Sequence, residues 1–219
     1  IIMDSIGSNT IPTLTIKNSQ IYNSSNFGVL GRETNIYAEN LVINNSGQSS
    51  LACTIGGTYN FVHSTFTNYW SNSFRQYPSV LINNFFTYSN NNIQIVETRD
   101  LLAANFTNCI IDGNSNIELL VNKVEGAVFN YSFKNNFIRF NDFNNSYIDI
   151  PEYNFEDESH YLGTILNGNV DFKSPYSNEL IIGENSDAIQ NANISGTQLV
   201  PNDILGVLRS SPADIGAYQ

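Results

Sequence analysis

Histidine is scarce in this chain, and its two copies are the first places to look for acid–base or metal chemistry. His63 stands in a strand-like alternation of apolar and polar residues, where we expect a hydrogen-bonded structural role rather than a catalytic one. The second copy closes an acidic segment that reads Glu156, Asp157, Glu158, Ser159 and His160. Carboxylates beside an imidazole could hold Ca²⁺ or another metal ion. An exposed acidic turn is the favoured interpretation, so no cofactor is expected, with Ca²⁺ as the weak exception.

An aromatic segment at residues 69–79 is the strongest candidate for binding. It contains the single Trp of the chain. Aromatic side chains on a loop that leaves a rigid scaffold can stack on sugar rings or anchor a partner protein. The alternative is that they fold back over the flank of the scaffold. The candidate residues are Tyr69, Trp70, Phe74, Arg75 and Tyr77.

The composition disfavours several classes of partner and includes enough apolar residues to form a core. The 219 residues carry a net charge of −11, which disfavours nucleic acid and anionic membranes. Charged residues are only 13%, and 35 Asn supply much of the polar surface. No apolar run approaches the roughly 18 residues of a spanning helix. Phosphate loops, zinc spacings and nucleophile elbows do not occur in the sequence.

The elements that must position these residues form a repeat. An eight-residue template (apolar, x, Asn, x, x, apolar, x, Asn) begins at residues 16, 38, 61, 81, 106 and 128, which are about 22 residues apart. Its third position holds Asn18, Asn40, His63, Asn83, Asn108 and Asn130. Its eighth position holds Asn23, Asn45, Asn68 and Asn135. The recurrence predicts two ladders of stacked polar side chains.

The period and pattern predict an all-β fold. About 22 residues is too short for paired-helix repeats, and the alternation broken by Asn, Gly and Ser is typical of short strands joined by turns. Stacked coils place like residues above one another, so the apolar columns fill the interior. Asn tolerates the left-handed conformation that a sharp coil turn needs. We therefore predict a parallel β-helix, a solenoid of about 22-residue coils.

The repeat resembles the right-handed parallel β-helix proteins of the pectin-lyase-like group, which have Asn ladders. The C-terminus resembles a bacterial secreted or surface subfamily with a D-I-G-A-Y-E tail (choice-of-anchor type). Here the tail reads Asp214-Ile215-Gly216-Ala217-Tyr218-Gln219, preceded by Gly206 and Arg209 where that subfamily has G-x-x-R. Residues 186–192, Ser-Asp-Ala-Ile-Gln-Asn-Ala, resemble its S-P-A-I-D-x-G but depart at Asp187, Gln190 and Ala192.

The resemblance implies polysaccharide chemistry as one option, and the residues can be compared with it. A glycoside hydrolase needs two carboxylates across the scissile bond, and the Asp-Asp pair of polygalacturonase-like members does not occur here. A pectate lyase needs Ca²⁺-binding carboxylates and a basic residue, and no R-x-P-x-x-R pattern is found. Carboxylates on different coils could still converge, so a lyase or hydrolase remains the alternative hypothesis.

We expect residues 1–146 to form the coils, as the C-terminal part of a longer solenoid, and residues 147–219 to form an irregular C-terminal cap. Cys53 and Cys109 lie in apolar contexts and on different coils, which predicts buried free thiols. No signal peptide is visible, and a lipid anchor would lie in a preceding N-terminal part.

The leading functional hypothesis is a non-catalytic, secreted or cell-surface protein, with the bacterial outer-membrane surface as one location. It would bind glycan or act as an accessory or structural component of a cell-envelope assembly. Its partners would be other cell-envelope proteins or polysaccharide.

Overall fold

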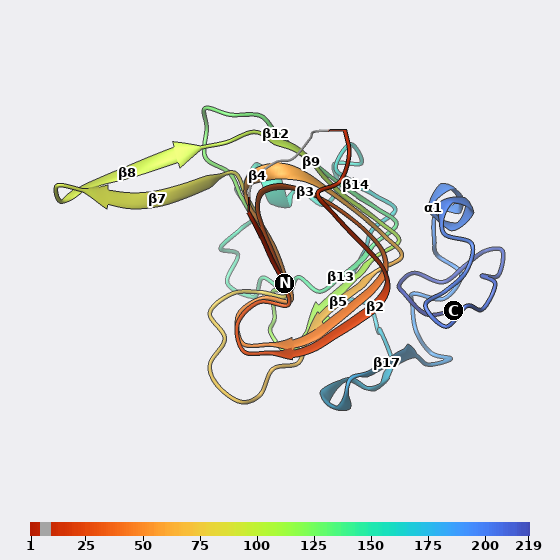
Figure 1. The fold of residues 1–219 in the computed structure, drawn as a ribbon. Helices are drawn as coiled ribbons and strands as arrows, with labels where there is room; N and C mark the ends of the chain where they lie inside the picture. The colour runs from red at the N-terminus through yellow and green to blue at the C-terminus, as the bar shows by residue number, and fades with distance from the viewer. Residues whose placement is uncertain (5–9) are drawn as a thin grey trace.

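Alternating apolar and polar residues form strands throughout this chain, and most of these strands join one parallel sheet. The computed structural model describes residues 1–4 and 10–219. Over this part the molecule is all-β, and its large sheet curls around a shared apolar interior (Figure 1). The large sheet of the described residues contains β1 (Ile2–Asp4), β2 (Leu14–Ser24), β3 (Val29–Ser46), β4 (Leu51–Val62), β5 (Thr65–Asn68), β6 (Val80–Asn83), β9 (Leu101–Thr107), β10 (Ile110–Gly113), β11 (Leu119–Asn122), β12 (Phe129–Lys134), β13 (Phe137–Ile138), β14 (Tyr161–Leu162) and β15 (Ile165–Leu166).

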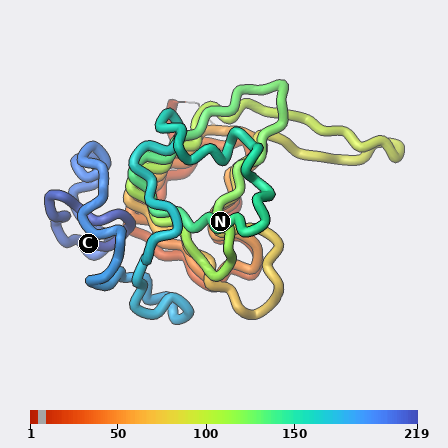
Figure 2. The backbone as a smooth tube through the Cα atoms, turned by 180° about the vertical axis from the view of Figure 1, so that it is seen from behind, coloured from red at the N-terminus to blue at the C-terminus, as the bar shows by residue number. Residues whose placement is uncertain are grey.

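Successive coils of the chain lie on one another with their strands parallel, as the view along the stack shows (Figure 2). One side of the sheet runs β2, β3, β4, β9, β12 and β14. Like residues meet in this register: Phe61 lies opposite Phe106, and Phe106 lies opposite Phe133. The rings of Phe106 and Phe133 stack with centroids 4.9 Å apart, and Tyr161 continues the column 5.3 Å from Phe133. Such aromatic columns bury large apolar area and form the core.

One coil is much longer than the others. The β4–β9 pairing places Val62 opposite Thr107, 45 residues later, whereas the neighbouring coils advance by 22, 23 and 27 residues. This long coil contains the 69–79 segment and a hairpin. The template copy beginning at residue 81 is therefore not a coil of its own. Its strand, β6, lies on another side of the same stack, between β4 and β11.

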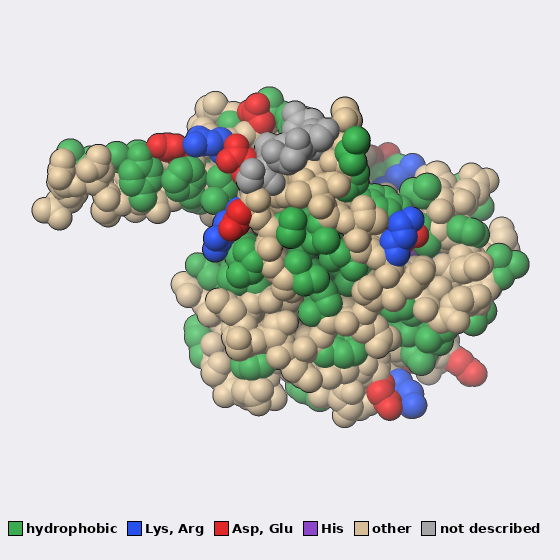
Figure 3. Space-filling model, in the orientation of Figure 1, with side chains coloured by type: hydrophobic (Ala, Val, Ile, Leu, Met, Phe, Trp, Pro, Cys, Tyr) green, Lys and Arg blue, Asp and Glu red, His purple; other side chains and the backbone are tan. Residues whose placement is uncertain are grey.

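The hairpin projects away from the stacked coils as a two-stranded arm, residues 85–98 (Figures 1 and 3). Its strands β7 (Phe85–Asn90) and β8 (Ile93–Thr98) are antiparallel and pair only with each other in the described chain. Phe86 and Tyr88 stack on one face of the arm, with centroids 5.7 Å apart. The arm is therefore an appendage of the coils.

The C-terminal region has two parts, one that covers the end of the stack and one that lies along its flank. Around the 3₁₀ helix η1 (Pro151–Tyr153), Tyr153 and Phe155 pack with Phe140 and Tyr161 at the end of the stack. Beyond residue 166 the chain runs back along the flank of the coils (Figure 1). This tail contains β16 (Phe172–Ser174), the 3₁₀ helix η2 (Pro175–Ser177), β17 (Glu179–Ile182) and α1 (Ile194–Leu199). Most of the region expected to cap the end is thus a strap along the side.

Both cysteines are buried, free thiols, as predicted. Burial raises the pKa of each thiol, which keeps both protonated at neutral pH. No helix in the described residues is long and apolar enough to cross a membrane.

Candidate functional site

The coil turn beside the tail is built from left-handed residues. Asn18, Asn40, His63, Asn108 and Asn135 occupy equivalent positions of successive coils, all with φ between 45° and 57°. The side chains bond along the stack: Nδ2 of Asn40 donates to Oδ1 of Asn18 at 2.9 Å, and Nδ2 of Asn108 lies 2.9 Å from Nε2 of His63. Asn suits this turn because it adopts the left-handed conformation at low cost. We call these five residues the turn ladder.

The turn ladder differs from the expected one at two positions. Asn135 takes the place expected for Asn130, which instead lies exposed on β12 and donates to the carbonyl of Leu102 at 3.2 Å. Asn83 lies on β6, opposite Asn122, and its Oδ1 accepts from the amide of Ile55 at 2.8 Å. The dense Asn background produced matching templates out of register with the real coils.

A second, shorter Asn column lies at the next turn. Asn23 and Asn45 both have a left-handed backbone conformation. The residues before and after them pair in register, Tyr22 with Asn44 and Ser24 with Ser46. Phe66 lies opposite Ile43 in the sheet. Asn68 and Asn45 stand two residues after Phe66 and Ile43, so they occupy equivalent positions. Asn68 is buried and bonds both the amide and the carbonyl of Ser46, at 3.0 and 2.9 Å. Asn135 lies in the turn ladder and not in this column.

The tail docks on the turn ladder through many specific contacts. Nη2 of Arg209 donates to Oδ1 of Asn40 at 2.7 Å. The amide of Gly216 donates to the carbonyl of Asn108 at 2.9 Å, and Nδ1 of His63 lies 3.2 Å from the carbonyl of Gly216. Gly216 has φ +107°, and a Cβ there would come within 2.7 Å of Ile110. Only glycine fits this approach without strain.

The docked tail forms one wall of a groove whose floor is the outward face of the parallel sheet. Two polar columns line that floor, and registers between paired strands define them. The first column contains Thr15, Tyr37, Asn60, Asn105 and Ser132. The second contains Lys17, Glu39, Val62, Thr107 and Lys134. We call this surface the sheet groove.

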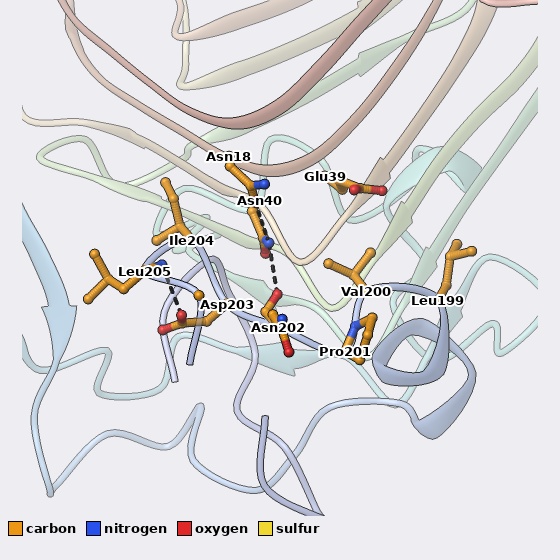
Figure 4. A pocket seen from close by; sticks show the side chains of 11 residues that line it. Asn18, Glu39, Asn40, Leu199, Val200, Pro201, Asn202, Asp203, Ile204 and Leu205 are labelled. Carbon is orange, nitrogen blue, oxygen red and sulfur yellow. Dashed lines mark hydrogen bonds between the residues drawn. The ribbon is translucent and has the colours of Figure 1, made fainter. Parts of the chain in front are cut away.

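Two hollows occupy the sheet groove, and Leu199 of α1 borders both. One, of about 320 Å³, lies over Tyr37, Asn60, Asn105 and Lys134. The other, of about 420 Å³, lies between Asn18, Glu39 and Asn40 on one side and residues 199–206 on the other (Figure 4). Glu39 and Asn40 of β3 line one hollow and Tyr37 of β3 lines the other, so the two hollows adjoin on this strand.

The polar groups of the sheet groove are held in place by one another. Nδ2 of Asn105 donates to Oδ1 of Asn60 at 2.9 Å. This leaves Asn105 one amide hydrogen and both carbonyl lone pairs for a ligand, and leaves Asn60 both amide hydrogens and one lone pair. Lys17 pairs with Glu39 at 3.1 Å and lies 5.6 Å from the ring centre of Tyr37. The hydroxyl of Tyr37 donates to Glu39 at 2.6 Å, and burial together with this bond raises the pKa of Tyr37.

Carboxylates of the sheet groove are already engaged. Glu39 is bound by Lys17 and Tyr37. Asp203 is buried under the tail, where its carboxylate accepts from the amides of Leu205, Val207 and Gln219. These hydrogen bonds give Asp203 a structural role in holding the loop together. The sheet groove therefore offers amides, hydroxyls, an aromatic ring and a lysine, which suits binding better than acid–base catalysis.

The aromatic segment at 69–79 divides into buried and exposed residues. Tyr69 is buried, donates to Asp112 and packs edge-on against Tyr176 with centroids 5.2 Å apart. Arg75 is also buried at its side chain and forms an ion pair with Glu118 at 2.6 Å. Trp70 is half-buried and donates to Ser73, whereas Phe74 is 90% exposed. Tyr77 packs partly against the small cluster around Leu81. The segment is thus anchored by Tyr69 and Arg75, and it presents Phe74 to solvent.

The acidic turn does not gather its side chains. No group of three or more His, Cys, Asp or Glu able to hold a metal ion occurs among the described residues. Asp157 accepts from the amide and hydroxyl of Ser159 at 2.9 and 2.6 Å, which lowers the pKa of Asp157. His160 stacks on Tyr131 with centroids 4.2 Å apart, and its Nδ1 lies 2.9 Å from the Tyr131 carbonyl. Glu156 and Glu158 are exposed.

Sequence reasoning missed the floor of the sheet groove. A polar residue stands three positions before every ladder residue and directly before four of the five, as Lys17, Glu39 and Lys134 do; Val62, before His63, is the exception. In a strand these positions face outward, opposite to the apolar residues between them. The wall formed by the tail had no such signal.

A scan against known protein families, a search of curated proteins and a search of solved structures found no match to this chain.

Proposed function

We propose that this protein is a glycan-binding, non-catalytic parallel β-helix that holds a linear, neutral polysaccharide in the sheet groove. The proposal includes the right-handed coil of the pectin-lyase-like group and a secreted or cell-surface location, which the repeat and the C-terminal tail favour. In this setting the protein would act as an accessory component of a cell-envelope assembly, with polysaccharide or other envelope proteins as partners.

The Asn60–Asn105 pair beside Tyr37 carries the proposal. Sugar rings present hydroxyls that both donate and accept, together with apolar C–H faces. A carboxamide supplies both kinds of hydrogen bond, and an aromatic ring supplies an apolar face. Polar side chains follow one another along the first column, from Thr15 to Ser132, at the strand spacing of about 4.8 Å. A repeating surface of this kind fits a repeating ligand.

Charge favours a neutral chain over a polyuronate. The net charge of −11 repels a polyanion over most of the surface. In the sheet groove, Glu39 neutralises Lys17, which leaves Lys134 as the single unpaired cation of the two columns. One lysine is a weak basis for binding a chain of carboxylates, whereas it can donate to hydroxyls.

The engaged state of Glu39 and Asp203 favours binding without cleavage. A glycoside hydrolase needs two carboxylates on opposite sides of the bond, one of them protonated and one free to react. Glu39 is held by a lysine and a tyrosine hydroxyl, and Asp203 by three backbone amides. Neither is placed as a proton donor.

The test is a panel of neutral and acidic polysaccharides in affinity electrophoresis, followed by product analysis. We expect retardation by at least one neutral polysaccharide and no new reducing or unsaturated ends. The Asn60→Ala/Asn105→Ala variant should migrate freely, while Gln94→Ala, an exposed change on the arm, should be retarded like the wild type. Retardation by acidic chains only, or release of products, would overturn the proposal.

A further inference from the structure

We infer that the protein has a second, separate ligand site, a pocket beside the 69–79 segment that takes one neutral pyranose ring. We call it the tyrosine pocket. It shares no residue with the sheet groove, so the observations that support it are independent of the proposed function. Its cavity measures about 420 Å³, within the range of small-molecule sites. Six residues form most of its wall: Gln76, Tyr77, Asn116, Ile117, Leu120 and Tyr147.

The tyrosine pocket is pre-formed because a buried ion pair fixes the segment above it. Arg75 contacts both oxygens of Glu118, at 2.6 and 2.8 Å. The same guanidinium donates to Ser115 at 2.7 Å and to the Tyr77 carbonyl at 2.9 Å. Burying two charges is costly, and an apolar pair would stabilise a surface loop at least as well. What the ion pair provides is one defined loop shape, and a rigid wall lowers the entropy lost on binding.

The wall offers unused hydrogen-bonding groups. The carboxamides of Gln76 and Asn116, both exposed, and the hydroxyls of Tyr77 and Tyr147 line the cavity and have no hydrogen-bond partner among the described residues. Donors and acceptors are therefore both available around one small cavity.

The chemistry of the wall selects a neutral ring. Anions are disfavoured because Glu118 already neutralises Arg75, and cations are disfavoured because no free carboxylate lines the cavity. Tyr77 and Tyr147 supply aromatic faces, and Ile117, Leu120 and Pro78 supply aliphatic surface. A pyranose ring combines an apolar C–H face with hydroxyls at its edge, and these two kinds of wall match both.

The experiment is a ligand-observed saturation-transfer titration of the full chain with methyl pyranosides of neutral hexoses. We expect saturation of at least one pyranoside, with a tenfold or greater loss of affinity in Tyr77→Ala. Because Tyr77 also packs against the coils, the surface variant Gln76→Ala/Asn116→Ala provides a second test and should weaken binding by a similar factor. The groove variant Asn60→Ala/Asn105→Ala should leave monosaccharide binding unchanged, and Gln94→Ala is the matched control.

Three results would overturn the inference. One is the lack of transfer to any neutral pyranoside. Another is binding that survives both pocket variants but disappears in the groove variant, which would assign the sugar to the groove alone. The third is a site that takes aromatic peptides and rejects pyranosides. Loss of the sheet-groove interaction with intact pyranoside binding would contradict the proposed function and leave this inference standing.

Discussion

Asn40 and Arg209, 169 positions apart in the chain, are joined by a hydrogen bond of 2.7 Å from Nη2 of Arg209 to Oδ1 of Asn40. The same carboxamide donates to Asn18 of the coil before it and to the carbonyl of Asn202 in the tail, at 2.9 Å each. One ladder residue thus links two coils to the tail that walls the sheet groove. The ladder is therefore a docking surface as well as a device that stacks the coils.

Removing this link should loosen the tail. Arg209→Ala leaves the buried Oδ1 of Asn40 without a donor, whereas the carbonyl of Ala217 keeps its bond from the amide of Ile204. One unsatisfied buried acceptor costs about 1–3 kcal/mol, so we expect a loss of about 2 kcal/mol in the free energy of unfolding. Chemical denaturation measures it. Lys173→Ala, which breaks an exposed pair with Glu179, is the control and should change stability by less than about 0.5 kcal/mol. Equal stability of Arg209→Ala and wild type would refute this role.

Acid should destabilise the protein through His63. Burial, with the nearby charge of Arg209, lowers the pKa of His63 to about 3 in the folded state, against an ordinary 6.5. Below pH 6.5 His63 binds a proton in the unfolded chain but not in the folded chain. The free energy of unfolding therefore falls as the pH drops from 6.5 towards 3. The full loss is on the order of 5 kcal/mol. Denaturation measured at pH 7, 5 and 4 follows it.

His63→Asn should flatten that pH dependence, since Asn is the residue of the other four turn-ladder positions and does not titrate. The control His160→Asn keeps His63 in place and should retain the acid-dependent loss. A His63→Asn profile as steep as that of the wild type would show that other groups dominate.

The ion pair below the tyrosine pocket should be sensitive to the loss of one partner. Glu118→Ala leaves the buried guanidinium of Arg75 uncompensated, and such changes cost about 3–5 kcal/mol. The double variant Arg75→Met/Glu118→Leu removes both charges and should recover much of this loss. Thermal denaturation compares them, with Glu125→Ala on the exposed Lys123–Glu125 pair as control. If Glu118→Ala were as stable as the wild type, the pair could not be what fixes the segment.

The arm should be dispensable for folding. Within the described part of the chain its strands pair only with each other, and Ile93 and Val96 are 66% and 48% exposed. Replacing residues 86–97 by a short Gly–Ser turn should change the free energy of unfolding by no more than about 1 kcal/mol, because few buried contacts are lost. A loss of cooperative unfolding in the shortened chain would mean that the arm supports the coils.

The sequence predicted what recurs locally and failed where one coil is interrupted. Asn18, Asn40, His63 and Asn108 were placed by the template because apolar residues at fixed offsets must point inward in every coil. Asn83 was misplaced because the 69–79 segment and the arm lengthen one coil to 45 residues, which hides its period. Asn130 was misplaced because the next coil advances by 27 residues, which puts Asn135 in the ladder position. The tail contacts were invisible for another reason. Pairs such as Gln20 and Tyr218, whose side chains bond at 2.8 Å, leave no pattern in a single sequence.

The central claim is that the sheet groove holds a neutral polysaccharide, and calorimetric titration of the groove variant tests it most directly. The two carboxamides of Asn60 and Asn105 should contribute about 1 kcal/mol each to binding. We therefore predict saturable binding of a neutral polysaccharide by the wild type and by Gln94→Ala, and an affinity at least tenfold weaker for Asn60→Ala/Asn105→Ala. Equal affinity of the wild type and the groove variant, in a variant that folds normally, would contradict the account.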